Sequence, residues 1–196
     1  MRTLLFLLLT TSTGWANCPT KEDMKSGIRF DVDENEYEIF RTVSNHVIEA
    51  KFHLEDGTIF RNLLGQGIYL LEVVDIENDS PVPSSRSTYT FPLAPVDLPL
   101  PTPGATWKTG VAILAPDGFD AEEQIYTFGE WTETNFGACT YKSMPISITY
   151  ATQEEDLGTK DTLNWLPDLG ISYLMATHDG SETTTYTYKS LRAVGK

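Results

Sequence analysis

The chain has 196 residues, with 14 Lys and Arg against 28 Asp and Glu, and its formal charge is −14. Hydrophobic residues make up 40% of the chain and aromatic residues 11%, a composition that excludes a disordered protein. The acidity excludes nonspecific nucleic-acid binding, and two cysteines with three histidines are too few for a disulfide-rich scaffold or a zinc finger. Composition leaves an ordinary globular protein.

Residues 1–16 have the pattern of a secretory signal peptide. Arg2 supplies a positive charge, Leu4 to Leu9 are continuously apolar, and Gly14 and Ala16 are the small residues of a cleavage site. The apolar run is far shorter than the roughly 20 residues that span a bilayer. We predict cleavage after Ala16, which removes Arg2 and changes the formal charge from −14 to −15. The mature protein would then be periplasmic or secreted, and not membrane-spanning.

The two cysteines, Cys18 and Cys139, have two interpretations. A bacterial lipoprotein carries Gly or Ala directly before its acylated cysteine, but Asn17 precedes Cys18. An oxidising compartment favours the alternative, an intramolecular disulfide between Cys18 and Cys139. Closing a loop of about 120 residues would stabilise the folded chain by roughly 4–5 kcal/mol in the chain-entropy model.

Residues 17–196 are predicted to form a single β-rich domain. Its first element is a short helix at residues 19–25, with Thr20 as N-cap and Gly27 at its end. Beyond it the dominant period is two: Ile28, Phe30 and Val32 alternate with charged residues, and residues 47–54 alternate in the same way. This alternation predicts an antiparallel sheet with one face on a core and the other in water.

Turn signals divide the rest of the chain into about twelve strands. Asp-Gly pairs at 56–57, 117–118 and 179–180 predict tight hairpins, and Glu34-Asn35 predicts a weaker turn. Residues 68–76 are predicted to be a central strand, and Pro145 a bulge or bend. The expected strands are 28–33, 36–43, 47–54, 58–64, 68–76, 87–91, 107–115, 123–129, 139–151, 162–165, 170–177 and 183–193. The predicted class is all-β: a curved antiparallel sheet forming an open barrel or a sandwich.

A proline-rich segment at residues 81–104 interrupts this pattern. Prolines at this density disfavour helix and central strand. A linker between two domains is one interpretation. We favour a strap along the surface of one domain, because Val96, Leu98 and Leu100 would be poorly placed in a free linker.

No catalytic motif, metal site or cofactor site is predicted. Gly65-Gln66-Gly67 begins a dinucleotide-binding pattern, but Leu70 occupies the third glycine position. Residues 31–36 begin like a calcium loop, but Glu36 replaces its glycine. The histidines are scattered, and His53 falls on the polar side of its strand.

Aromatic residues give the one suggestion of a binding site. Tyr126 and Phe128 share one face of a predicted strand, and Tyr186 and Tyr188 share one face of the last strand. Core packing and cross-strand pairing are the simpler interpretation of such residues. The functional interpretation is an aromatic-lined pocket for an apolar ligand or a sugar, with these four residues as ligand-binding candidates.

The segment Trp165-Leu166-Pro167-Asp168-Leu169-Gly170, followed by the apolar residues 171–176, predicts a turn anchored by Trp165 and Leu169. It resembles an ending found in exported β-rich proteins of Gram-negative bacteria, where such a turn joins two late strands of a curved antiparallel sheet. Lipoprotein carriers of the periplasm have a related half-barrel fold. The resemblance covers this C-terminal segment only, and it implies a periplasmic envelope protein.

Together these observations predict an exported, non-catalytic binding protein for an apolar or lipid-like ligand or for an envelope partner. Two alternatives stay open. One is a secreted hydrolase that uses carboxylates, which requires two acids converging in a cleft. The other is a structural or assembly factor of the cell envelope, recognised through its sheet edges.

Overall fold

The computed structural model describes residues 18–32, 35–151 and 156–195. The predicted signal peptide at 1–16 and Glu34 of the predicted first turn lie outside these residues. Within the described part of the chain, no helix is both long and apolar enough to cross a membrane.

The N-terminal helix is present as a single 3₁₀ helix, η1 (Lys21–Lys25). Asp23 accepts a hydrogen bond from the backbone N–H of Thr20 at 2.9 Å, so the two residues close the helix start. Gly27, which follows the helix, has φ of +115°, a value that an L side chain rarely adopts. The predicted cap and stop are confirmed, although the helix is 3₁₀ and not α.

In the described part of the chain, fifteen strands form one sheet, and every pairing in it is antiparallel. The strand order is β14-β13-β12-β11-β9-β8-β7-β5-β4-β3-β2-β1-β15, with β10 beside β11 and β6 beside β5. The strands are β1 (Ile28–Asp31), β2 (Tyr37–Ser44), β3 (Val47–His53), β4 (Ile59–Gly65), β5 (Tyr69–Glu77), β6 (Ser80–Pro81), β7 (Ser87–Thr90), β8 (Thr106–Ala115), β9 (Gly118–Phe128), β10 (Thr132–Phe136), β11 (Cys139–Ala151), β12 (Asp156–Leu166), β13 (Ile171–Asp179), β14 (Glu182–Thr185) and β15 (Ser190–Ala193).

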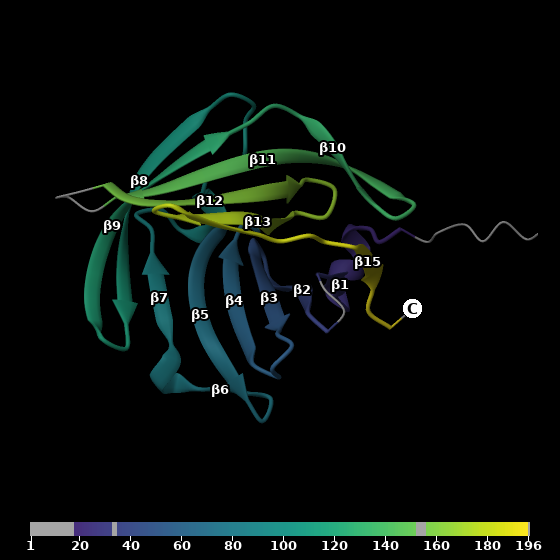
Figure 1. Cartoon of the computed structure of the whole chain (residues 1–196), viewed down its shortest axis with the longest axis horizontal. Helices are drawn as coiled ribbons and strands as arrows, with labels where there is room; N and C mark the ends of the chain where they lie inside the picture. Colours follow the sequence, from purple (N-terminus) through teal and green to yellow (C-terminus); the bar gives the residue numbers. More distant parts are fainter. Residues whose placement is uncertain (1–17, 33–34, 152–155, 196) are drawn as a thin grey trace, which may run out of the picture.

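The sheet curls so that its two halves face each other (Figure 1). Strands β8 to β13 form one layer and β2 to β5 the other, with the bend near β8 and β9. The sheet stays open, because β14 and β15 lie at opposite ends of the strand order. Residues 186–189 carry the chain from one edge to the other. The predicted all-β class is confirmed, with a single curled sheet and not two separate ones.

The predicted count of about twelve strands is too low for three reasons. β6 is only two residues long and contains Pro81. β10 has the sequence TETNF, whose only buried residue is Phe136, so it shows no apolar alternation. The predicted strand 183–193 is wrong as one element, since it divides into β14 and β15, which pair with different neighbours, β13 and β1.

The predicted turns and the bend have different outcomes. All three Asp-Gly pairs lie at hairpin connections, between β3 and β4, β8 and β9, and β13 and β14. The pairing of β11 with β12 is continuous through Pro145, so the bulge expected there is absent. The register of β11 against β12 shifts instead between Thr149 and Ala151. Pro145 lies where one edge of β11 changes partner from β10 to β9, a position that tolerates the missing N–H.

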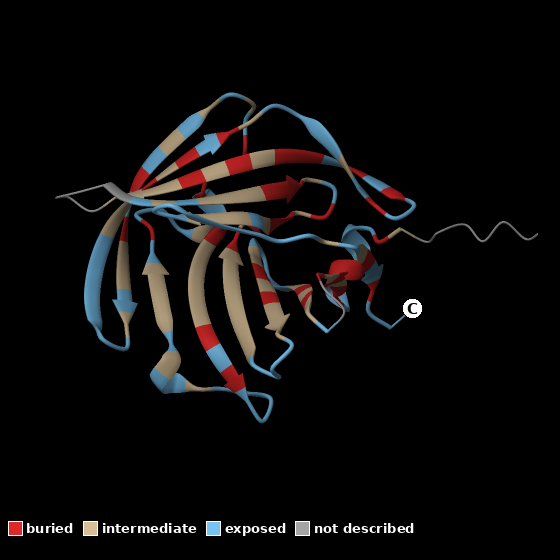
Figure 2. Ribbon diagram, in the orientation of Figure 1, coloured by how far each residue is buried: buried red, intermediate tan, exposed pale blue. Residues whose placement is uncertain are grey.

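Two apolar clusters form the core. One surrounds Phe30 and Tyr173 and includes residues of η1, β1 to β3, β13 and β15, and the other surrounds Tyr69 and Tyr126 under β5, β8, β9 and β11. Figure 2 shows buried residues along β11 and around η1 and β1, whereas β4 and β7 are only half-buried.

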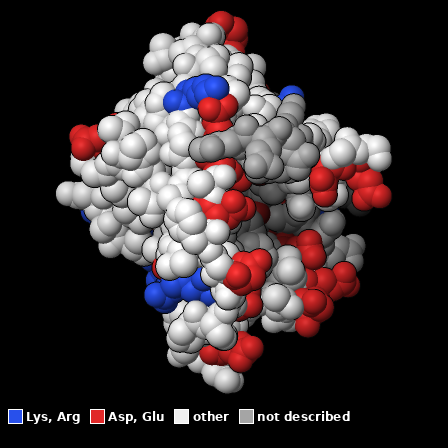
Figure 3. Space-filling view, turned by 90° about the vertical axis from the view of Figure 1, so that its left-hand side faces the viewer, with Lys and Arg blue, Asp and Glu red and all other residues white. Residues whose placement is uncertain are grey.

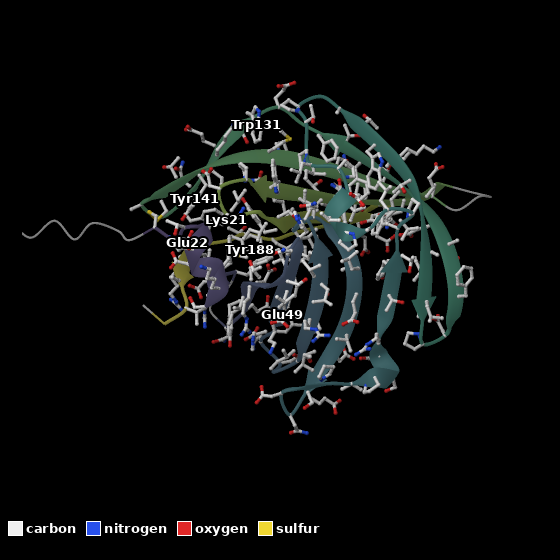
Figure 4. All side chains as sticks on the ribbon, turned by 180° about the vertical axis from the view of Figure 1, so that it is seen from behind. Lys21, Glu22, Glu49, Trp131, Tyr141 and Tyr188 are labelled. Carbon is white, nitrogen blue, oxygen red and sulfur yellow. A yellow bond between two sulfur atoms is a disulfide. The ribbon has the colours of Figure 1, made fainter. Side chains whose placement is uncertain are left out.

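The predicted disulfide between Cys18 and Cys139 is present. Cys139 is the first residue of β11, so the bond ties the start of the described chain to the first core cluster. Close by, the Tyr141 hydroxyl donates to the Pro19 carbonyl at 2.7 Å, and Figure 4 shows Tyr141 beside η1. Burial raises the pKa of Tyr141 to about 12, which keeps this hydroxyl a donor.

The proline-rich segment 81–104 packs against the second cluster and contributes Phe91 and Leu98 to it. It contains the short strand β7 and two 3₁₀ turns, η2 (Pro83–Ser85) and η3 (Pro95–Asp97). Leu98 is buried, while Val96 and Leu100 are exposed. The Tyr69 hydroxyl donates to the Pro99 carbonyl at 2.6 Å, so the segment is held by both an apolar and a polar contact.

Candidate functional site

A cavity of about 470 Å³ lies between the two layers of the curled sheet. This volume falls in the range of small-molecule sites. Strands from both halves of the sheet contribute to its walls, and most of the wall residues are apolar. The aliphatic and phenylalanine side chains that line it are Phe40, Phe52, Leu64, Ile68, Leu70, Ile113, Ile148, Leu163 and Leu174.

The cavity explains why strand β4 is half-buried although it lies inside the sheet. Six of its seven residues have intermediate exposure. Asn62 and Leu64 point inward by the strand period, and both line the cavity. Figure 2 shows this strand in the colour of intermediate burial along most of its length. The inward face of β4 therefore borders open space and not a packed core.

Strand β9 places a chain of polar groups on the cavity wall. Glu122, Gln124 and Tyr126 alternate along the strand, so all three point to the same side. The Tyr126 hydroxyl donates to the Gln124 side-chain oxygen, and the Gln124 amide donates to Glu122 Oε1 at 2.6 Å. Burial raises the pKa of Glu122, and the charge of the nearby Asp161 contributes to the same shift.

Asp161 of β12 is the second carboxylate on this side of the cavity. Cross-strand register aligns Tyr126, Ile148, Asp161 and Thr177 across β9, β11, β12 and β13. The carboxylate accepts hydrogen bonds from the Tyr150 hydroxyl at 2.7 Å and the Thr177 hydroxyl at 2.8 Å. Burial and the charge of Asp161 raise the pKa of Tyr150, which stays protonated as a donor.

Glu38 of β2 is a third carboxyl group, on the opposite layer. Its side chain is 5% exposed and lines the cavity. Tyr188 donates to its Oε1 at 2.7 Å, while Oε2 is buried and has no hydrogen-bond partner among the described residues. Burial raises the pKa of Glu38 from 4.5 to about 8, although the hydrogen bond from Tyr188 acts in the other direction. Figure 4 shows Tyr188 between the two layers.

The four aromatic residues predicted as ligand contacts take different positions. Tyr126 lines the cavity, and Tyr188 contacts Glu38, which also lines it. Phe128 is buried in the second core cluster and is not among the lining residues. Tyr186 is 36% exposed, in the segment between β14 and β15. Of the four, Tyr126 alone is among the described lining residues; Tyr188 reaches the cavity only through its hydrogen bond to Glu38, and Phe128 and Tyr186 also lie outside the lining.

Sequence reasoning did not identify the three carboxyl groups of the cavity. One signal was available, because each acid occupies the inward parity of its strand. Glu38 shares a face with Phe40, Glu122 with Tyr126, and Asp161 with Leu163. An acid in the apolar register of an alternating strand is unusual, and burial of the group requires a compensating partner.

The other candidate sites have local partners. Within the described residues, no group of three or more His, Cys, Asp or Glu side chains could hold a metal ion. Asp31 of the calcium-like segment pairs with Arg29 at 2.6 Å and accepts a hydrogen bond from Ser190. His53 stacks on Tyr37 with ring centroids 4.2 Å apart. Asp33 and Glu34 of the calcium-like segment lie outside the described residues.

The predicted turn after β12 is confirmed and helps to close the cavity. Leu169 is buried in the first core cluster and Trp165 in the second. The N–H of Gly170 donates to the Leu166 carbonyl at 2.8 Å. Just beyond, Ser172 donates to the Gly67 carbonyl through both its N–H and its hydroxyl, each at 2.8 Å. These bonds join β13 to the β4–β5 turn of the opposite layer.

Fold and site thus define an all-β protein whose open, curled sheet encloses a cavity. The walls of this cavity are mostly apolar and carry three carboxyl groups. No protein-family model matches the chain, and a search of curated proteins finds no match. Among solved structures, it is similar to the crystal structure of the hypothetical lipoprotein YmcC from Escherichia coli. The two are 12% identical, the similarity covers 89% of this chain and 90% of that chain, and the TM-score is 0.46.

Proposed function

We propose that this is an exported binding protein that holds an apolar or lipid-like small molecule between the layers of its sheet. The observation that carries the proposal is the cavity of about 470 Å³ with largely apolar walls. A packed β-protein fills its interior with side chains, and voids larger than a water molecule are few. Here the inward residues of β4 and β13, such as Leu64 and Leu174, face the void.

Export is part of the same proposal. The disulfide between Cys18 and Cys139 supports it, because such bonds persist in oxidising compartments. The signal-peptide pattern of residues 1–16 supports it as well. We place the mature protein in the periplasm or outside the cell, as one β-rich domain with residues 81–104 as a surface strap. The proposal includes, as the alternative to a small-molecule ligand, a protein of the cell envelope as the binding partner.

Native mass spectrometry of protein purified from its own compartment tests the proposal. The expected spectrum contains an adduct of a few hundred daltons that is lost on denaturation. In parallel, the emptied protein should take up the neutral apolar dye N-phenyl-naphthylamine, with a fluorescence increase on binding. Absence of both the adduct and the dye uptake would rule out a small-molecule site.

A filling variant locates the binding site. Leu174→Trp adds a ring where the side chain borders the cavity, so we expect dye affinity to fall about tenfold or more. Leu100→Trp is the matched control, because Leu100 is 57% exposed on the proline-rich segment. Equal losses in both variants would mean that the dye binds elsewhere.

A carboxylate-dependent hydrolase is the second candidate. It is favoured by Glu122 and Asp161, two carboxyl groups that line one cavity, with the pKa of Glu122 raised. Turnover of chromogenic glycosides or esters that is abolished in Glu122→Gln would establish it. Dye binding without turnover of these substrates would exclude the hydrolase and leave the proposed binding function.

A further inference from the structure

The acidic and polar groups on the β9 to β13 layer of the cavity have partners within that layer. Hydrogen bonds join them to one another: Tyr126 to Gln124, Gln124 to Glu122, and Tyr150 and Thr177 to Asp161. Buried polar groups that satisfy each other in this way need no hydrogen bond from a ligand. The polar part of a ligand therefore has to be sought on the opposite layer.

The opposite layer carries two buried polar atoms without a partner. Glu38 of β2 is 5% exposed, and its Oε2 has no hydrogen-bond partner among the described residues. Oδ1 of Asn62 on β4 is also buried and lacks a partner within the described chain. Both residues line the cavity. A buried polar atom left unpaired costs free energy, which a ligand group can recover.

The register of the sheet places Glu38 and Asn62 on the same inward face. Glu38 pairs with Phe52 of β3, and Asn62 pairs with Ala50, the next inward residue of that strand. Strand spacing therefore separates the two backbone positions by about 12 Å. A single small head group contacts one of them. Glu38 is the stronger anchor, because it is buried whereas Asn62 is half-buried.

No basic group compensates Glu38. Its cross-strand partners are Phe30 and Phe52, its hydrogen-bond donor is Tyr188, and none of the described lining residues is Lys, Arg or His. A carboxyl group in such surroundings keeps its proton at neutral pH, which agrees with its pKa of about 8. Tyr188 donates to Oε1, so the proton lies on Oε2. Oε2 is therefore a donor that lacks an acceptor.

Resting on the proposed function, we propose that the ligand of the cavity is an uncharged amphiphile of the long-chain alcohol class, whose hydroxyl oxygen accepts a hydrogen bond from Glu38. Its apolar chain extends along Leu64, Leu70 and Leu174, which line the cavity. The last torsion of a Glu side chain is soft, so a small turn of the carboxyl group directs Oε2 toward the occupant. A hydroxyl also donates, so a second hydroxyl on the same molecule would satisfy Oδ1 of Asn62.

Charged head groups are disfavoured in this cavity. An anionic head, as in a fatty acid, would meet Glu122 and Asp161 across the same space, where a low dielectric strengthens repulsion. Figure 3 also shows acidic side chains gathered along the middle of the face at β8 and β9. A cationic head at Glu38 would require the ionised carboxylate, and the desolvation of two buried charges offsets their attraction. A hydroxyl incurs neither cost.

The test compares three ten-carbon probes that differ only in the head group: decanol, decanoate and decylamine. Affinity is measured on the emptied full-length protein by displacement of N-phenyl-naphthylamine at neutral pH. We expect decanol to bind about tenfold tighter than decanoate and also tighter than decylamine. This order is measured on the wild-type protein, so it does not depend on how any variant folds.

Two variants assign the hydroxyl to Glu38. Glu38→Met keeps the length of the side chain but cannot hydrogen-bond, so decanol affinity should fall about tenfold. Glu38→Gln keeps both a donor and an acceptor without a charge, so it should retain decanol affinity within about threefold. Dye affinity should change by less than about twofold in both variants, which also reports that they fold. Glu77→Met is the matched control, because Glu77 is an exposed acid on β5.

The outcomes separate the two proposals. Dye binding with equal affinity for all three probes, or with decanoate or decylamine bound tightest, overturns the uncharged ligand and leaves the proposed function standing. Unchanged decanol affinity in a Glu38→Met variant that binds the dye overturns the assignment to Glu38. An equal loss in Glu38→Gln also overturns it, because the hydrogen bond would not be the cause. Failure of the dye and of every probe to bind overturns the proposed function itself.

Discussion

Glu38 shows how much a single residue can determine in a β-sheet protein. It occupies an inward position of β2, and its cross-strand partners, Phe30 and Phe52, are apolar. Taking a carboxyl group out of water without a basic partner disfavours its ionised form, and the pKa of about 8 expresses this cost. The residue is therefore mostly neutral below about pH 8.

This raised pKa predicts a pH dependence of stability. Between pH 4.5 and about 8 the folded protein holds a proton on Glu38 that the unfolded chain releases. Stability should therefore fall as pH rises through this window, by up to roughly 1.4 kcal/mol per pH unit, and the loss should level off above it. Glu38→Gln should flatten this slope in urea denaturation curves measured at about pH 5, 6.5 and 8.

Two further variants show whether the slope belongs to Glu38. Glu77→Gln removes an exposed acid and should retain the slope of the wild-type protein. Tyr188→Phe removes the hydrogen bond that favours ionised Glu38, so the pKa of Glu38 should rise and the window should extend to higher pH. A slope that persists unchanged in Glu38→Gln would show that another group, such as Glu122, dominates.

At the scale of elements, the contact between the β4–β5 turn and β13 joins the two layers. A Cβ at Gly67 would lie 2.2 Å from the Gly170 carbonyl oxygen and 2.9 Å from the Ile171 Cα. Both atoms belong to the backbone, so neither can move aside cheaply. Gly67 also has φ of +70°, and its carbonyl accepts two hydrogen bonds from Ser172. Only glycine permits this close approach.

Gly67→Ala should therefore destabilise the protein by about 3 kcal/mol or more, since a backbone clash adds to the left-handed backbone conformation. Gly137→Ala is the matched control: its φ is +60°, but nothing lies within 4 Å of the added Cβ. The control should cost about 1–2 kcal/mol in chemical denaturation. Equal losses in the two variants would show that conformation alone, and not the contact between layers, sets the cost.

The elements also show what sequence could and could not predict. Period-two alternation and Asp-Gly turns are local, so they located β3, β4 and β13 and their hairpins. The pairing of β15 with β1 is not local, and no pattern in residues 186–189 marks the crossing between sheet edges. The cavity was hidden for the same reason. Glu38 and Asp161 come from strands whose proximity depends on how the whole sheet curls.

At the scale of the whole molecule, an open sheet that leaves a cavity must be held in shape by contacts at its rim. The outer face contributes a ladder of alternating charges, in which Glu49 and Glu72 lie between arginines of β2, β4 and the segment before β7. The Gly67–Ser172 contact and the Tyr188–Glu38 hydrogen bond link the layers from within. The covalent link is the disulfide, which spans 121 residues of sequence.

Removing that disulfide tests how far the fold depends on it. In the chain-entropy model, Cys18→Ser with Cys139→Ser should lower the free energy of unfolding by up to about 4–5 kcal/mol, because the unfolded chain regains the freedom of a long loop. The folded contacts of η1 remain available, since Tyr141 still donates to Pro19.

Urea denaturation with and without a thiol reductant measures the effect. The reductant should lower the midpoint of the wild-type protein to that of the double variant and leave the double variant unchanged. A wild-type midpoint that already equals that of the double variant would show that the cross-link contributes nothing to stability.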